Sequence, residues 1–129
     1  MLDLLTRINS EINQCRYSAD PAYFDDWRPG DEGSAKDCDS YAVAKLRKLI
    51  EAGIPIEAQR LALCYVETGE YHAVLIVETA EGAWMLDNRQ HFPVPVLEIA
   101  ALGYKPDRIQ EFGGSPDWVE WKSNEEIKT

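Results

Sequence analysis

The strongest constraint on the fold of this chain is a change of hydrophobic period shortly after residue 50. From Asp37 onward, apolar side chains recur at helical spacing, and Gly53 followed by Pro55 is a natural helix end. Three short runs with strand character come next, joined by tight turns; they cover residues 61–66, 71–79 and 83–86. Such runs form an antiparallel meander, so the pattern predicts an α+β domain with the helix packed on one face of the sheet.

The flanking segments are expected to complete this domain. An amphipathic helix is predicted over residues 2–15, and the polar loop 18–36 separates it from the second helix. Beyond the meander, Pro93 and Pro95 argue against a strand. A short helix is expected over 96–102 and a strand over 107–112. The 129 residues suit one domain, which we expect to span residues 1–129.

Composition excludes several classes of partner. Hydrophobic residues make up 45% and charged residues 28%, as in globular proteins, and the formal net charge is -10. This charge argues against nucleic acid and anionic membrane surfaces as partners. No run approaches the ~20 apolar residues of a membrane span, and the acidic N-terminal helix does not resemble a signal peptide. Three cysteines without a CxxC pair fit a reducing compartment, so synthesis in the cytoplasm is expected.

Cys38 is the candidate nucleophile because of its predicted place in the first turn of the second helix. The positive end of a helix dipole favours the thiolate, which is the reactive form of cysteine. The alternative is a buried cysteine that packs as a small hydrophobic residue.

His72 and Asp87 are the candidate partners of that thiol. His72 lies in an apolar strand pattern, on the face shared by Val74 and Ile76, where an imidazole needs a polar partner. Asp87 follows the next strand and can reach His72, with Asn88 as a second candidate for this role. The order Cys, His, Asp is that of papain-type or transglutaminase-type triads. The alternatives are a satisfied core histidine and an ordinary Asp-Asn turn.

Four runs resemble the bacterial transglutaminase-like cysteine peptidase family: residues 37–45 (DCDSYAVAK), 53–55 (GIP), 72–75 (HAVL) and 84–88 (WMLDN). Upstream residues also fit the family's N-terminal pattern: Asn9, Asn13, Tyr17, Asp20, Asp26, Trp27 and Pro29. The resemblance spans roughly residues 8–95. It implies a papain-like, transglutaminase-like fold in which the nucleophile helix packs on an antiparallel sheet.

The resemblance also implies residue roles. Cys38 would be the nucleophile, His72 the general base and acid, and Asp87 the orienter. Trp27 is a candidate second oxyanion donor through its indole N–H, beside the Cys38 backbone N–H. The other reading of Trp27 is a core or lid aromatic residue.

The run around the nucleophile departs from the family pattern. The family usually has Gly-Asp-Cys-Glu-Asp-Tyr, whereas this chain has Lys-Asp-Cys-Asp-Ser-Tyr at residues 36–41. In adhesin-cleaving members, acids flanking the cysteine contribute to a calcium site. Asp37 and Asp39 retain oxygen ligands, but Ser40 replaces the third acid. We therefore predict no cofactor, with calcium at Asp37 and Asp39 as the alternative.

The sequence as a whole predicts a cysteine hydrolase that cleaves an amide bond of a protein or peptide through a thioester intermediate. An acyltransferase with the same triad is one alternative, since it differs only in the nucleophile that enters the site. A non-catalytic binding module that keeps the fold is the other.

Overall fold

The computed structural model describes the backbone of residues 1–14 and 34–121, and side chains for residues 1–13 and 41–121. Two α-helices, two 3-10 helices and six strands make up this part of the chain. Their bounds are α1 Leu2–Gln14, α3 Ser34–Glu51, η1 Ile56–Ala58, β1 Gln59–Tyr65, β2 Tyr71–Thr79, β3 Gly82–Leu86, β4 Val94–Pro95, η2 Val96–Leu102, β5 Lys105–Gln110 and β6 Trp118–Glu120.

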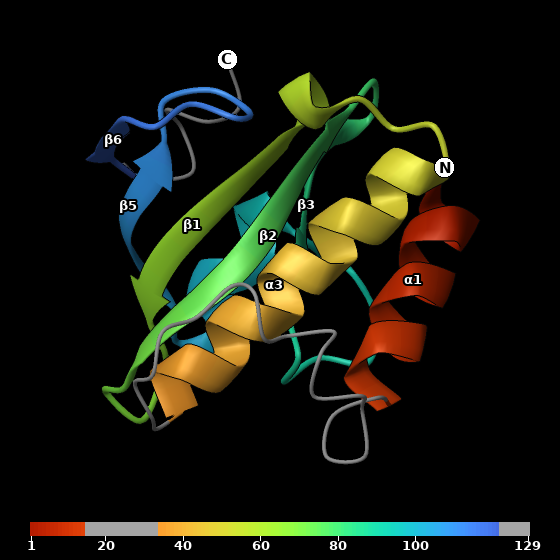
Figure 1. Ribbon diagram of the computed structural model, residues 1–129. Helices are drawn as coiled ribbons and strands as arrows, with labels where there is room; N and C mark the ends of the chain where they lie inside the picture. Colours follow the sequence, from red (N-terminus) through yellow and green to blue (C-terminus); the bar gives the residue numbers. More distant parts are fainter. Residues whose placement is uncertain (15–33, 122–129) are drawn as a thin grey trace.

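The strands form one antiparallel sheet in the order β4-β3-β2-β1-β5-β6 (Figure 1). The β1–β2 pair runs in register from Gln59 opposite Val77 to Tyr65 opposite Tyr71. The turn between them contains Gly69 with φ of 91°, a conformation that glycine adopts without strain. The central strands are therefore joined by a tight local turn, as the sequence predicted.

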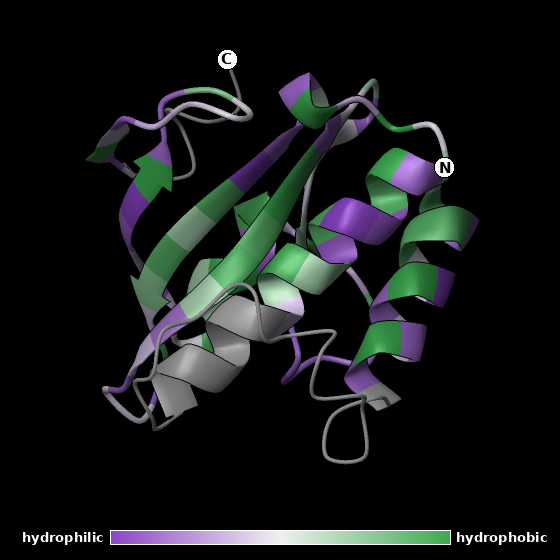
Figure 2. Ribbon diagram, in the orientation of Figure 1, coloured by the Kyte–Doolittle hydropathy of each residue, from purple (hydrophilic) through white to green (hydrophobic). Residues whose placement is uncertain are grey.

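Both α-helices cover the same face of the sheet, with α3 packed on β2 and α1 beside α3 (Figure 1). Hydrophobic and hydrophilic residues alternate along α1 and along the described part of α3, as in amphipathic helices (Figure 2), and Leu5, Ile8 and Ile12 of α1 are buried. This layer contains one of the two hydrophobic clusters. Its buried members are Leu5, Ile8, Ile12, Tyr41, Ala42, Ala44, Leu49, Leu75, Val77 and Leu86.

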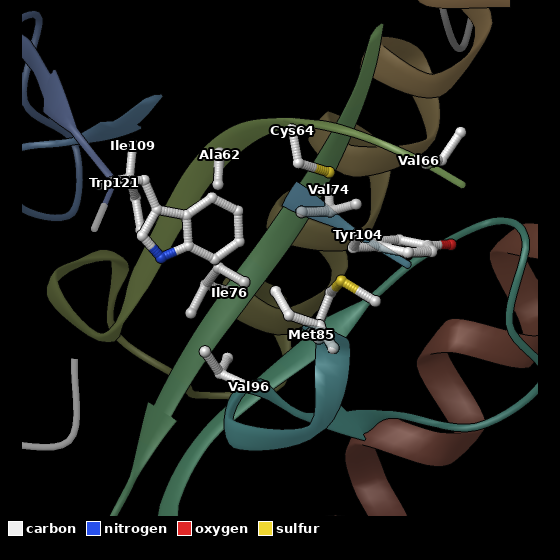
Figure 3. Packing of buried hydrophobic residues seen from close by; sticks show 11 residues of the cluster. Ala62, Cys64, Val66, Val74, Ile76, Met85, Val96, Tyr104, Ile109 and Trp121 are labelled. Carbon is white, nitrogen blue, oxygen red and sulfur yellow. The ribbon is translucent and has the colours of Figure 1, made fainter. Parts of the chain in front are cut away.

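The second cluster lies on the opposite face of the sheet (Figure 3). Alternate residues of β1 and β2 point into it, because successive side chains of a strand face opposite ways. Its buried members are Ala62, Cys64, Val66, Val74, Ile76, Met85, Val96, Ile99, Tyr104, Ile109 and Trp121. The sheet therefore has a buried hydrophobic layer on each of its two faces.

The predicted fold class is confirmed, and several element boundaries differ from the prediction. The second helix begins at Ser34 instead of Asp37, so Cys38 is its fifth residue and lies beyond the first turn. The helix dipole acts mainly within the first turn, so its effect at Cys38 is weaker than predicted.

The proline-containing segment is a strand after all. Val94 and Pro95 form β4, which pairs with β3 at the edge of the sheet. Proline has no backbone N–H to donate, and an edge strand tolerates this because one of its sides has no neighbouring strand. The last predicted strand begins two residues earlier, at Lys105, and β6 was not predicted. In the described parts of the chain, no helix is long and apolar enough to cross a membrane.

Candidate active site

A buried histidine-aspartate pair lies where β2 begins and β3 ends. The imidazole Nε2 of His72 is 2.5 Å from Oδ1 of Asp87. His72 is 7% exposed and Asp87 is 1% exposed. The antiparallel register of β2 and β3 creates this contact, since Leu75 opposite Leu86 places the end of one strand beside the start of the other.

The carboxylate of Asp87 is held by further hydrogen bonds. The Tyr104 hydroxyl lies 2.5 Å from Oδ2, and the Arg89 backbone N–H donates to Oδ1 at 3.3 Å. Burial by itself would raise the pKa of Asp87, but the hydrogen bonds from His72 and Tyr104 hold it below its ordinary value. Asp87 therefore carries a negative charge beside the imidazole at neutral pH.

Two asparagines of α1 bind the backbone that follows Asp87. The Asn13 side-chain amide donates to the carbonyls of Asp87 and Gln90 at 3.2 Å each, and the Asn9 amide donates to the Gln90 carbonyl at 2.9 Å. Asn9 and Asn13 are four residues apart and so share one face of the helix. The N-terminal helix α1 thus holds the backbone of the loop that contains Asp87.

Lys45 is a charged residue in the interior of α3. The side chain is 0% exposed, and within the described part of the chain its Nζ has no hydrogen-bond partner. Burial lowers the pKa of Lys45 to about 7, while the negative charge of Asp87 acts in the opposite direction. Lys45 is therefore a second titratable group in the electrostatic field of the His72–Asp87 pair.

The remaining predicted site residues are placed only in part. Cys38 belongs to α3, and α3 and β2 begin at the same end of the molecule (Figure 1). The side chains of Trp27, Asp37, Cys38 and Asp39 lie outside the described residues. The imidazole bonds Asp87, whereas the buried Oδ1 of Asn88 has no hydrogen-bond partner among the described side chains. Asp87, and not Asn88, is thus the residue that contacts the imidazole.

Residues 1–13 and 41–121 contain no cluster of three histidine, cysteine or acidic side chains that would hold a metal ion. The acids proposed as calcium ligands, Asp37 and Asp39, lie outside this search.

Sequence reasoning assigned no role in the site to Tyr104, Arg89 or Glu67. No local pattern marks them, because each meets the site only through the fold. Lys45 did carry a signal: it is a charged residue on the apolar stripe of its helix, where lysine is rarely buried.

A family model for bacterial transglutaminase-like cysteine proteinases matches residues 1–126. The chain belongs to that family. It is therefore a cysteine peptidase of the transglutaminase-like type, as the sequence predicted.

Solved structures support the transglutaminase-like fold. Calcium-bound LapG of Legionella pneumophila superimposes with a TM-score of 0.63 and 21% identity, over 93% of this chain and 71% of that one. EGTA-treated LapG superimposes with a TM-score of 0.63 and 22% identity, over 92% of this chain and 66% of that one. A third structure of LapG from Legionella pneumophila superimposes with a TM-score of 0.66 and 21% identity, over 98% of this chain and 72% of that one. A search of curated protein sequences found no significant match.

Proposed function

We propose that this cysteine peptidase hydrolyses amide bonds of a protein or peptide substrate through a triad of Cys38, His72 and Asp87. The observation that carries the proposal is the buried 2.5 Å contact between His72 Nε2 and Asp87 Oδ1. An ionised carboxylate on one ring nitrogen fixes the tautomer of the ring and stabilises the imidazolium. In a cysteine peptidase, that arrangement serves a thiol.

The proposed chemistry follows from which ring nitrogen meets the carboxylate. Asp87 receives the Nε2–H bond, so Nδ1 is the nitrogen that exchanges protons during the reaction. Nδ1 takes the thiol proton of Cys38, and the thiolate attacks the substrate carbonyl. The imidazolium then protonates the leaving amine as the C–N bond breaks, which leaves a thioester on Cys38. A water then gives a proton to Nδ1 and attacks the thioester carbonyl. The C–S bond breaks, the acid product leaves, and the imidazolium returns the proton to the Cys38 thiolate.

We propose that calcium binds this chain weakly or not at all. LapG is known in a calcium-bound form. Here, Asp37 and Asp39 flank the proposed nucleophile, but Ser40 offers a neutral hydroxyl where the family pattern has a third acid. Calcium takes six to eight oxygen ligands and gains affinity from their negative charge, so the loss of one carboxylate weakens the site.

Alkylation by iodoacetamide, followed by peptide mapping, tests the triad. A thiolate paired with an imidazolium reacts well below pH 8, so Cys38 should label at pH 6.5 much faster than Cys15 or Cys64. Cys64 is fully buried, so slow labelling there is no proof by itself. The sharper control is His72→Gln, which leaves Cys38 in place but removes its base.

The outcome for Cys38 decides the proposal. Rapid labelling at pH 6.5 that drops to the rate of an ordinary thiol in His72→Gln would support it. Equal labelling of the three cysteines, or an unchanged Cys38 rate in His72→Gln, would refute it.

A further inference from the structure

We propose that Tyr104 is a positioning residue for the triad: it donates its hydroxyl proton to Asp87 and is held in place by the Arg89–Glu67 ion pair. This inference rests on the proposed roles of His72 and Asp87, and it extends the site by residues that bear no local motif.

Tyr104 has the position that such a role requires. Its ring is 2% exposed and belongs to the hydrophobic cluster away from the α-helices, with the hydroxyl pointing out of the cluster (Figure 3). That hydroxyl is 2.5 Å from Oδ2 of Asp87. The same ring meets His72 edge-on, with centroids 6.4 Å apart and planes at 86°. Tyr104 therefore contacts both members of the pair.

The direction of the Tyr104 hydrogen bond follows from its other neighbours. Arg89 Nη1 lies 3.0 Å and Gln90 Nε2 lies 3.2 Å from the phenol oxygen. Both are N–H groups that can only donate, so the oxygen accepts from them and its single proton goes to Asp87. Burial and the negative charge of Asp87 raise the pKa of Tyr104, which keeps the phenol neutral and able to donate.

An ion pair fixes Arg89 over the tyrosine. Its guanidinium binds Glu67 through two parallel hydrogen bonds of 2.9 and 2.5 Å, and its Cζ lies 5.6 Å from the centre of the Tyr104 ring. Glu67 approaches the backbone next to Tyr104 so closely that a Cβ on Gly103 would lie 2.7 Å from the Glu67 Cβ. Gly103, with φ of 91°, is therefore required for this contact.

Both carboxylate oxygens of Asp87 therefore take part in hydrogen bonds. Oδ1 faces His72 and Oδ2 accepts from Tyr104, so Asp87 cannot rotate away from the imidazole without losing a buried hydrogen bond. Among the described residues, Lys45 of α3 interacts electrostatically with Asp87 and Glu67 of the β1–β2 turn with His72, whereas the charge of Arg89, in the loop after β3, acts on Tyr104. Of these, only Arg89 hydrogen-bonds the phenol oxygen.

The test is Tyr104→Phe, which removes the hydroxyl but retains the ring. Asp87 then has a buried oxygen without a donor, and its carboxylate is more easily protonated or rotated. We expect iodoacetamide labelling of Cys38 at pH 6 to slow about tenfold, because the imidazolium is less well stabilised. We also expect the His72 Nε2–H proton signal in the NMR spectrum, identified by its loss in His72→Gln, to broaden through exchange with water.

Tyr71→Phe is the matched control. It breaks a tyrosine–aspartate hydrogen bond of the same 2.5 Å length, to Asp107, outside the site. It should leave both the labelling rate and the His72 signal unchanged. A merely structural role for Tyr104 would lower the melting temperature of Tyr104→Phe without moving either readout, and that result would overturn the proposal.

A second variant covers the case in which Tyr104→Phe does not fold. Arg89→Met removes a hydrogen bond to the phenol oxygen from a partly exposed position, and it should change both readouts in the same direction by a smaller factor. No change in Arg89→Met would also overturn the proposal. Failure of the triad itself looks different, because the parent protein would then show no selective labelling of Cys38 below pH 8.

Discussion

Replacing Lys45 with methionine should stabilise this protein, and the gain should shrink as the pH rises. Lys45 is 0% exposed, and no described side chain or carbonyl accepts a hydrogen bond from its Nζ. Burial lowers its pKa from 10.5 to about 7, against the attraction of Asp87. Methionine fills a similar volume without a charge, so it should remove the cost of burying the ammonium group.

The size and sign of the expected change in the free energy of unfolding follow from proton linkage. Between pH 7 and 10.5 the unfolded chain binds more protons at Lys45 than the folded chain does, so the parent becomes more stable as the pH rises through this window. Below pH 7 the amine is protonated in both states, and the fall from 10.5 to about 7 corresponds to a destabilisation of about 5 kcal/mol. At pH 9 about 2 kcal/mol of this cost remains. Lys45→Met should therefore gain about 3 kcal/mol more at pH 6 than at pH 9.

Urea unfolding of parent and variant at pH 6 and pH 9 measures this difference directly. Other groups titrate in the same range, so the quantity to compare is the variant minus the parent at each pH. Lys48→Met is the matched control, since Lys48 lies one turn along α3 with 41% of its side chain exposed and should change little. A gain that does not depend on pH, or a loss of stability at pH 6, would show that the amine has a partner and would refute the reasoning.

Three further predictions concern the orienting residue, calcium and the packing of the turn between β5 and β6. Asp87→Ala should fold normally but lower kcat by about 10³-fold or more on any peptide that the parent cleaves, because the imidazole loses its fixed tautomer; normal turnover there, with an inactive Asn88→Ala, would transfer the orienting role to Asn88. Millimolar calcium or EGTA should leave the melting temperature nearly unchanged; micromolar binding in calorimetry that Asp39→Ala abolishes would contradict this. Gly113→Ala should cost several kcal/mol in urea unfolding, since its Cβ would lie 2.0 Å from the Ile56 carbonyl oxygen; a parent-like midpoint would mean that the backbone yields easily.

The sequence by itself determined the elements whose signals are local. The apolar stripe of α3 and its end near Gly53 were predicted from helical spacing, and the β1–β2–β3 meander from three short runs with strand character and the tight turns between them. These features also placed His72 near the start of one strand and Asp87 after the end of the next. Antiparallel pairing of consecutive strands brings such positions together, so the 2.5 Å contact was predictable in kind, though not in length.

Only the tertiary structure decided the surroundings of that pair. Tyr104 is 17 residues from Asp87 in the chain, and Asn13 is 74 residues away, so neither contact has a local signature. The edge strand β4 likewise depends on pairing with β3, and the proline-rich sequence of this segment gives no local signal for that pairing. Lys45 shows the difference most clearly: its place on an apolar stripe is local information, but its lack of a hydrogen-bond partner among the described residues and its interaction with Asp87 arise from packing. Helical and strand periods act over a few residues, whereas burial and charge depend on every element that surrounds a side chain.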